Sequence, residues 1–72
     1  MLDFANRLKQ LRKQNKIKQS EMSAFLDVST RHYQEIEYGK VNIPTLTLIK
    51  LADYFNVSLD YLVGRSNDPT RH

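Results

Sequence analysis

The chain has 72 residues, which is enough for one domain and too few for two. It contains no cysteine, so disulfides and thiolate metal sites are excluded. Hydrophobic residues make up 40% and charged residues 26%, a balance typical of a globular domain and not of a disordered chain. No apolar run is long enough to cross a membrane, and Asp3 disfavours a signal peptide. The default expectation is a soluble intracellular protein.

The formal net charge is +3, and the basic residues are concentrated near the start of the chain. No acidic residue occurs between Asp3 and Glu21. Such a run is either the solvated face of a helix or an electrostatic footprint for a polyanion, and charge alone does not separate the two. The basic residues of this segment, called the basic segment below, are Arg7, Lys9, Arg12, Lys13, Lys16 and Lys18.

Apolar spacing predicts helices and no strands. A first helix is expected over 3–14, because apolar residues recur at i, i+4 and i+7 from Phe4. A second is expected over 19–26, where they recur at i, i+3 and i+4 from Met22. The chain shows no sustained alternation of Val, Ile and Thr and no Asn-Gly or Asp-Gly hairpin signal.

Local signals also predict a third helix. Asp27 tolerates the left-handed backbone that a tight turn between helices needs. Ser29 is a good N-cap for a helix that runs to Tyr38, and Gly39 supplies its C-terminal stop.

Two more helices complete the series. Pro44 opens a fourth helix, whose apolar stripe ends at Phe55. Ser58 caps a short fifth helix over 59–63, which ends at Gly64. The expected organisation is therefore one all-α domain of five helices.

The domain is expected to cover residues 1–64, followed by a tail over 65–72. The tail has no apolar anchor and is predicted to be flexible.

The second and third predicted helices have the dimensions of a helix-turn-helix unit. Such a unit needs a small residue where its helices cross, and Ser23-Ala24 supplies it. Its turn needs an unusual backbone conformation followed by an apolar side chain, and Asp27-Val28 can serve.

The third helix is predicted to have two faces, given its helical spacing. Tyr33, Ile36 and Glu37 lie on the inner face. The residues assigned to the outer face are Thr30, Arg31, Gln34, Glu35 and Tyr38. Arg, Gln and Thr read base edges in the major groove, although any solvated helix also shows such residues.

Four segments together resemble the Cro/CI-type (XRE-type, lambda-repressor-like) helix-turn-helix family of phage and bacterial repressors. They are RLKQLR at 7–12, IKQSEMSAFLDVS at 17–29, IEYG at 36–39 and LIKLADYFNVSLDYLVG at 48–64. The resemblance runs from residue 7 to residue 62, about three quarters of the chain. It implies a compact five-helix all-α domain that inserts its third helix into the major groove and binds partly palindromic operators as a dimer.

Roles for single residues follow from the same resemblance, position by position. The residues expected to contact bases are Thr30, Arg31, Gln34 and Glu35. The residues expected to contact the DNA backbone are Gln19, Lys18, Ser29, Tyr38, Lys40 and Asn42. Arg12 and Glu37 are expected to form an internal ion pair between the first and third helices. The departures from the family pattern are Lys18 in place of a serine N-cap, Asp27 in place of glycine, and Tyr33 in place of a smaller aliphatic residue.

Glu35 has two interpretations of equal weight. It can pair with Arg31 one turn earlier, an interaction that stabilises a helix by a few tenths of a kcal/mol. It can also accept a hydrogen bond from a cytosine amino group and repel phosphates in wrong registers.

Catalytic and metal sites find no support in the sequence. Only His32 and His72 are available as imidazole ligands, which is too few to assemble a metal site. No serine nucleophile with a matching histidine and acid, glycine-rich phosphate loop or carboxylate dyad occurs. We therefore expect a protein that is not an enzyme and needs no metal or cofactor.

The leading hypothesis is a sequence-specific regulator of transcription, most simply a repressor, that binds double-stranded DNA. The alternative is an interaction module, such as an antitoxin, that keeps the fold without reading DNA. A homodimer is expected at least on DNA, through Leu59, Leu62 and Val63. No membrane or small-molecule ligand is expected, and the location is the cytoplasm of a bacterium, at its nucleoid, with a bacterial or phage gene. The sequence fits a complete Cro-like protein and a fragment of a longer repressor equally well.

Overall fold

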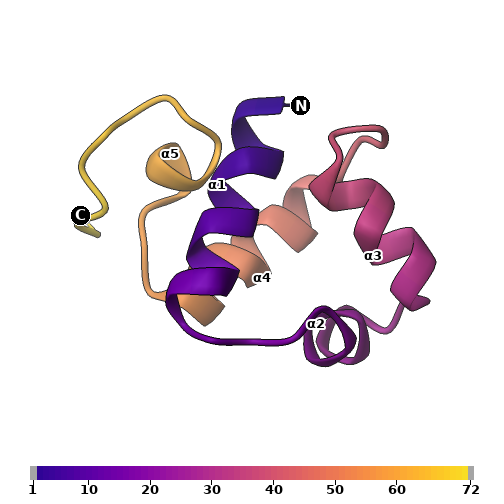
Figure 1. Ribbon diagram of the computed structural model, residues 1–72. Coiled ribbons are helices and arrows are strands. Elements are labelled where there is room, and N and C mark those ends of the chain that lie inside the picture. The colour runs from indigo at the N-terminus through magenta and orange to yellow at the C-terminus, as the bar shows by residue number, and fades with distance from the viewer. Residues whose placement is uncertain (1, 72) are drawn as a thin grey trace.

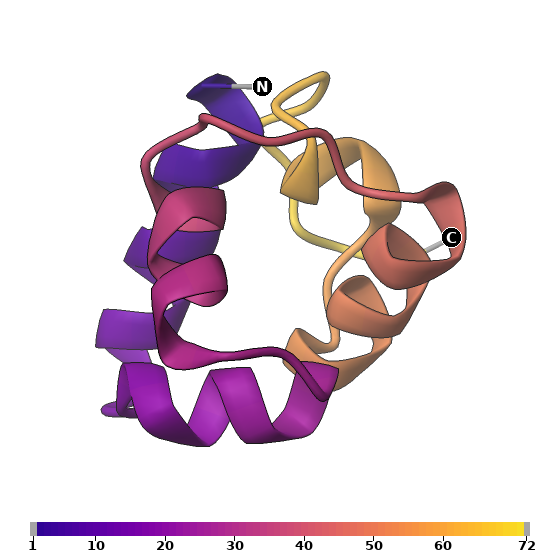
Figure 2. The same ribbon diagram turned by 90° about the vertical axis from the view of Figure 1, so that its right-hand side faces the viewer.

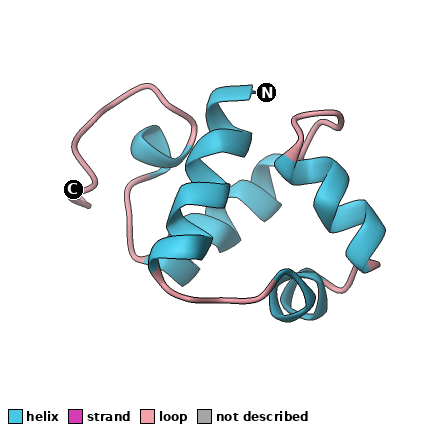
Figure 3. Ribbon diagram, in the orientation of Figure 1, coloured by secondary structure: helices cyan, strands magenta, loops and turns pink. Residues whose placement is uncertain are grey.

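The computed structural model describes residues 2–71, and these form five helices joined by loops, with no strand among them (Figures 1 and 3). The helices are α1 (Leu2–Gln14), α2 (Gln19–Leu26), α3 (Thr30–Glu37), α4 (Thr45–Phe55) and α5 (Leu59–Leu62). The all-α fold with five helices is confirmed. The differences from the sequence-based bounds are small, since α1 begins one residue earlier and α3 and α5 each end one residue earlier.

The ends of the helices follow the local signals in the sequence. Asp27 and Asn56 both adopt the left-handed conformation, with φ of 57° and 54°, and end α2 and α4. Ser29 and Ser58 cap α3 and α5, because their Oγ atoms accept hydrogen bonds from the third residue beyond, each at 3.0 Å. Lys16 also has a positive φ of 56°, which nothing in the sequence indicated.

The hydrophobic core draws on every helix. Its largest fully buried side chain is Tyr33 of α3, which lies among residues from α1, α2, α4 and α5. The buried apolar residues are Phe4, Ala5, Leu8, Leu11, Met22, Tyr33, Ile36, Leu48, Leu51, Ala52, Val57 and Leu62. Since α3 shares this core, its orientation is fixed by packing as well as by the turn before it.

The helices are arranged so that α2 and α3 form one side of the molecule. In Figure 1, α3 stands at the right with α2 seen end-on below it, whereas α5 and the C-terminal tail lie at the left. Figure 2, which views the molecule from that right-hand side, shows α3 in front and the tail behind. The helix-turn-helix unit and the tail therefore lie on opposite sides.

The tail packs back onto the domain. The backbone N–H of Ser58 donates to the carbonyl of Pro69 at 3.0 Å, and Arg71 forms an ion pair with Asp53 of α4. Residues 65 and 66 also donate from their backbone N–H groups to the carbonyl of Asp60. The flexibility expected of this tail stays a prediction, and His72 lies outside the described residues.

Gly64 marks a close approach between the two ends of the domain. Its φ is +85°, and a Cβ atom there would lie 2.7 Å from the Cβ of Asp3 in the first turn of α1. Only glycine meets both conditions without a shift of the backbone. This contact seats α5 against α1, away from α3.

Candidate nucleic-acid interface

The turn between α2 and α3 has the features that a helix-turn-helix unit requires. Ser23 is buried, and its Oγ lies 3.4 Å from the Oγ1 of Thr30, whereas Ala24 is exposed. The small residue at the crossing of the two helices is therefore Ser23 alone. Val28 is partly buried and packs against the core, and its N–H donates to the carbonyl of Ser23 at 3.0 Å. These contacts set the angle at which α3 leaves the turn.

The inner face of α3 carries a buried ion pair with α1. Arg12 Nε donates to Glu37 Oε2 at 2.6 Å, and Arg12 Nη2 donates to Glu37 Oε1 at 3.2 Å. The two side chains are only 11% and 2% exposed. Arg12 Nη1 also donates to the carbonyl of Ile17 at 2.9 Å, in the loop after α1. The structure thus brings together the two residues that the resemblance pairs.

Further donors complete the surroundings of Glu37. The hydroxyl of Tyr33 donates to Oε2 at 2.5 Å, and the Nε2 of Gln19 donates to Oε1 at 3.1 Å. Tyr33 occupies a position where the family pattern has a smaller aliphatic residue, so this phenol is an addition to the network. No buried side-chain nitrogen or oxygen in the described part of the chain lacks a hydrogen-bond partner.

These contacts determine the charge state of the network. Burial alone would raise the pKa of Glu37, but hydrogen bonds from Arg12, Tyr33 and Gln19 outweigh it and hold the pKa below its ordinary value. The hydrogen bond to Glu37 raises the pKa of Arg12. Burial, followed by the hydrogen bond to Glu37, raises the pKa of Tyr33. At neutral pH the network therefore holds a charged pair and a protonated phenol.

Gln19 and Gln34 are joined to this network rather than free. The Nε2 of Gln34 donates to the Oε1 of Gln19 at 3.2 Å, and Gln19 in turn donates to Glu37. Sequence reasoning placed Gln19 at a phosphate and Gln34 at a base, and it missed the bond between them. The one available signal was the i, i+3 spacing of Gln34 and Glu37, which puts both on neighbouring turns of α3.

The outer face of α3 presents Thr30, Arg31 and Glu35. Thr30 and Arg31 are exposed, and Glu35 is partly exposed. Arg31 Nε lies 3.7 Å from Glu35 Oε1, and the Arg31 side chain is 91% exposed. An exposed pair of this length contributes little to stability. Both side chains therefore remain available to a partner, and the two interpretations of Glu35 stay open.

The residues expected at the DNA backbone, apart from Gln19, lie at the surface. Lys18, Lys40 and Asn42 are exposed, and Tyr38 is 62% exposed with the Nζ of Lys40 5.7 Å from its ring centre. The Oγ of Ser29 serves as the N-cap of α3.

The basic segment divides into two groups. Its arginines are used internally: Arg7 stacks on the ring of Tyr61 at 3.9 Å, and Arg12 pairs with Glu37. Its lysines at positions 9, 13, 16 and 18 are exposed, and none forms an ion pair within residues 2–71. The fully exposed positive charges of this segment are therefore those of its lysines.

The expected dimer surface near α5 changes in one respect. Leu62 is fully buried in the core of the monomer, so its side chain is not available to a second copy. Leu59 is 37% exposed and Val63 is partly buried. Exposed apolar side chains also occur on α4, where Leu46 and Ile49 are 80% and 41% exposed.

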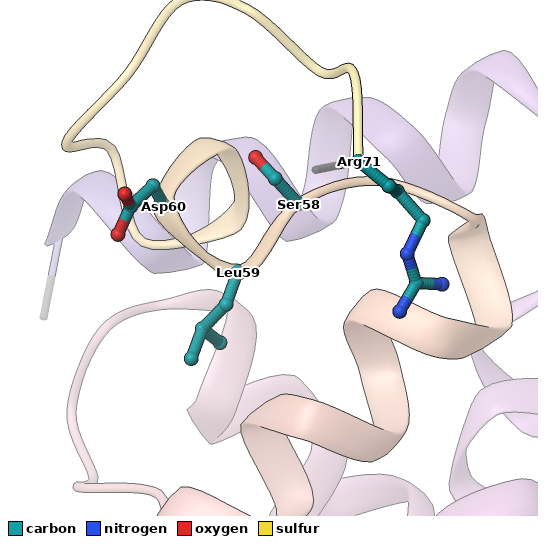
Figure 4. A pocket seen from close by; sticks show the side chains of 4 residues that line it. All are labelled: Ser58, Leu59, Asp60 and Arg71. Carbon is teal, nitrogen blue, oxygen red and sulfur yellow. The ribbon is translucent and has the colours of Figure 1, made fainter.

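A surface pocket of about 290 Å³ lies beside α5 and is lined by Ser58, Leu59, Asp60 and Arg71 (Figure 4). Its lining residues come from the start of α5 and from the returning tail. Figure 1 shows α5 and the tail on the side of the molecule opposite α3. Arg71 is already paired with Asp53. The pocket is thus separate from the helix-turn-helix face.

Comparison with known sequences agrees with this architecture. A family model described as helix-turn-helix matches residues 8–62, which include all five helices except the first six residues of α1. The chain belongs to the Cro/CI-type helix-turn-helix family. The lambda-repressor-like fold is thereby confirmed, and the family is one of DNA-binding domains and not of enzymes.

The chain is also similar to three regulators of Bacillus subtilis strain 168. It is 38% identical over 66 residues to the uncharacterized HTH-type transcriptional regulator YqaE, covering 90% of this chain and 57% of the relative. It is 30% identical over 66 residues to YobD, with 92% and 59% covered. It is 35% identical over 60 residues to the SPbeta prophage-derived regulator YonR, with 83% and 56% covered. The chain thus spans less than two thirds of the length of these relatives, and no solved structure gives a significant match.

None of the helices between residues 2 and 71 combines the length and apolarity needed to cross a membrane. Within the same residues, no three His, Asp or Glu side chains gather in a way that suits a metal ion.

Proposed function

We propose that this chain acts as the DNA-binding domain of a transcriptional regulator and reads double-stranded DNA with α3 in the major groove. The proposal is supported, in a domain of this family, by the difference between the inner and outer faces of α3. Its inner face is held to α1 by the buried Arg12–Glu37 pair, and its outer face leaves Arg31 and Glu35 exposed. The names of the three relatives, all HTH-type transcriptional regulators, support the same conclusion.

The charge of the domain suits a phosphate backbone. The exposed lysines of the basic segment and Lys40 have no carboxylate partner within the described residues. Each lysine that neutralises a phosphate releases a counterion and makes the affinity depend on salt. Base contacts are assigned to Thr30, Arg31, Glu35 and Gln34, and backbone contacts to the residues around them.

The regulator is proposed to be a homodimer on a partly palindromic operator and to repress by occupying it, in the bacterial cytoplasm. Leu59 and Val63 are proposed to contribute to the dimer surface. Leu62 is not, because it is buried in the core of the monomer. The exposed Leu46 and Ile49 of α4 are proposed as further side chains that could contact a second copy.

Selection of bound sequences from random duplexes tests this function. The proposal predicts a motif of two inverted half-sites whose centres lie about one helical turn apart. Affinity for that motif should fall with salt by roughly 0.9 log units per log unit of salt for each phosphate neutralised.

The controls separate this function from the alternative of an interaction module. Arg31→Ala should relax the preference at one position in each half-site, whereas Gln10→Ala, on an exposed part of α1, should change none. Recovery of no motif, together with tight binding of a protein partner that is insensitive to salt, would favour an antitoxin-like module instead.

A further inference from the structure

The hydroxyl groups of Ser23 and Thr30 connect α2 to α3. The Oγ of Ser23 donates to the carbonyl of Ser20 at 2.9 Å, within α2. The same Oγ lies 3.4 Å from the Oγ1 of Thr30, the first residue of α3. Ser23 is buried, with only 5% of its surface exposed, whereas Thr30 is exposed. A side chain at the expected DNA surface is therefore bonded to one inside the crossing of the two helices.

The proton between these two hydroxyls comes from Thr30. A hydroxyl has one proton, and a carbonyl oxygen can only accept. The proton of Ser23 is therefore used in the shorter bond, to the carbonyl of Ser20. Ser23 still has lone pairs that accept, so Thr30 is the donor in the second bond. A Thr30 hydroxyl that donates to Ser23 has no proton left to offer to a base.

The same bond determines which part of Thr30 is left for a partner. The substituents on the Cβ of a threonine occupy staggered positions, so a fixed Oγ1 also fixes the methyl group. The Oγ1 is turned toward the buried Ser23 and away from the outside. Thr30 itself is exposed, so the group that its side chain offers to a partner is the methyl.

The bases of DNA differ in how they suit such a side chain. In the major groove guanine offers two acceptors, which need a donor, whereas thymine carries a 5-methyl group that takes apolar contacts. A threonine whose proton is already used cannot donate to guanine. Its methyl group suits thymine.

We propose that Thr30 reads a thymine 5-methyl group with its own methyl, and that Ser23 is the positioning residue that holds the Thr30 hydroxyl away from the base. This inference rests on the proposed function, since it needs a domain that reads DNA. It gives the buried Ser23 a second task besides filling the crossing of α2 and α3, which is to exclude guanine at one position of each half-site.

The experiment is operator selection, followed by affinity measurement on operators that carry thymine, uracil or guanine at the position of Thr30. That position is the one at which Thr30→Ala changes the selected base. Uracil has the hydrogen-bonding groups of thymine and lacks its methyl. The variants are Thr30→Val, Thr30→Ser, Ser23→Ala and the double variant of Ser23→Ala with Thr30→Val. Thermal melts establish that each variant is folded before its affinity is compared.

A matched control is available on α2. Ser20→Ala removes an exposed hydroxyl and keeps the backbone carbonyl that accepts from Ser23. It should leave the preference among the three operators as in the wild type.

The Thr30 variants test the methyl contact. Uracil in place of thymine should weaken binding of the wild type by about 3- to 10-fold, the equivalent of one methyl group removed from an apolar contact. Thr30→Val keeps the methyl and should show the same loss with uracil. Thr30→Ser keeps the hydroxyl alone and should bind the thymine and uracil operators equally.

The Ser23 variants test the positioning. Ser23→Ala frees the Thr30 hydroxyl to donate, so the preference for thymine over guanine should shrink by about 2- to 10-fold. In the Thr30→Val background there is no hydroxyl to free, and Ser23→Ala should then leave this preference unchanged. A change in packing alone would act in both backgrounds.

Four results would overturn the inference, and they differ in what they leave standing. Equal affinity of the wild type for thymine and uracil removes the methyl contact and keeps the proposed function. So does a preference for cytosine or adenine that Thr30→Val loses, because it makes Oγ1 an acceptor. An effect of Ser23→Ala that is equally large in the Thr30→Val background removes Ser23 as a positioning residue. Recovery of no motif by the folded wild type removes the proposed function as well.

Discussion

Two arginine–glutamate pairs meet on α3, and they differ in almost everything except composition. Arg12–Glu37 is buried, with a 2.6 Å contact and side chains 11% and 2% exposed. Arg31–Glu35 lies on the surface, with a 3.7 Å contact and side chains 91% and 40% exposed. Breaking a buried pair costs about 3–5 kcal/mol because the remaining charge is stranded, whereas an exposed pair contributes about 0–1 kcal/mol. The same two residue types therefore hold the helix on one face and remain free to bind on the other.

The orientation of the exposed pair adds to this difference. On a helix, an acid four residues before a base agrees with the helix dipole, and the reverse order agrees less well. Arg31 precedes Glu35, which is the less favourable order. Nothing in the geometry of this pair therefore demands that it persist when DNA is bound.

The largest effect is expected from removing the buried carboxylate. Glu37→Ala strands Arg12 and deprives Tyr33 and Gln19 of their acceptor, so we expect a loss of about 3–5 kcal/mol in the free energy of unfolding. Thermal and denaturant unfolding measure this loss. Operator affinity per folded molecule should change less than stability does. A melting temperature equal to that of the wild type would contradict the structural role of Glu37.

A smaller effect is expected from the phenol that this chain adds to the network. Tyr33→Phe keeps the buried ring and removes the donor to Glu37 Oε2, which should cost about 1.5–3 kcal/mol, as for other hydrogen bonds to charged groups. Denaturant unfolding at neutral pH measures the cost. A variant as stable as the wild type would mean that the Arg12 and Gln19 bonds satisfy Glu37 without the phenol.

The difference in the free energy of unfolding between the wild type and Glu37→Gln should become smaller as the pH falls. The folded-state pKa of Glu37 lies below its ordinary value of 4.5. The charged carboxylate therefore contributes stability that is fully present above that value and is lost as the pH falls through the lower folded-state pKa. Denaturant unfolding at a series of pH values between about 2 and 7 follows this loss. A gap of constant size throughout would contradict the assigned charge state.

The smallest effect on stability is expected on the exposed face. Glu35→Gln removes only the surface pair with Arg31 and should change the free energy of unfolding by no more than about 0.5 kcal/mol. Selected operators then decide between the two interpretations of Glu35. A changed preference at one position, with loss of cytosine, identifies a base contact, and an unchanged preference at every position leaves only the surface pair.

Features set by neighbouring residues could be predicted from the sequence. The left-handed turn at Asp27 and the caps at Ser29 and Ser58 follow from residue types at fixed offsets, and all three are confirmed. The inner face of α3 was also predicted, because Tyr33 and Ile36 recur at helical spacing and both are buried.

Features that depend on distant contacts could not be predicted in the same way. The bond between Gln19 and Gln34 and the stacking of Arg7 on Tyr61 join residues 15 and 54 positions apart, and no local pattern specifies such pairs. The fifth helix has four residues, too few for its apolar spacing to show that Leu62 faces the core and Leu59 does not.

The other missed surface belongs to α4. That helix carries apolar residues on several sides, so its sequence did not reveal that Leu46 and Ile49 stay exposed. The packing of the tail could not be predicted either, because the bond from the N–H of Ser58 to the carbonyl of Pro69 uses backbone groups that do not depend on side-chain type.

The central claim is that α3 is held by its inner face and free to bind with its outer face. It is tested most directly by the coupling energies within the Arg12–Glu37 and Arg31–Glu35 pairs. Double-mutant cycles in the free energy of unfolding use Arg12→Met with Glu37→Gln, and Arg31→Met with Glu35→Gln. We predict a coupling of about 1.5–3 kcal/mol for the buried pair and below about 0.5 kcal/mol for the exposed pair. Equal coupling energies for the two pairs would contradict the division.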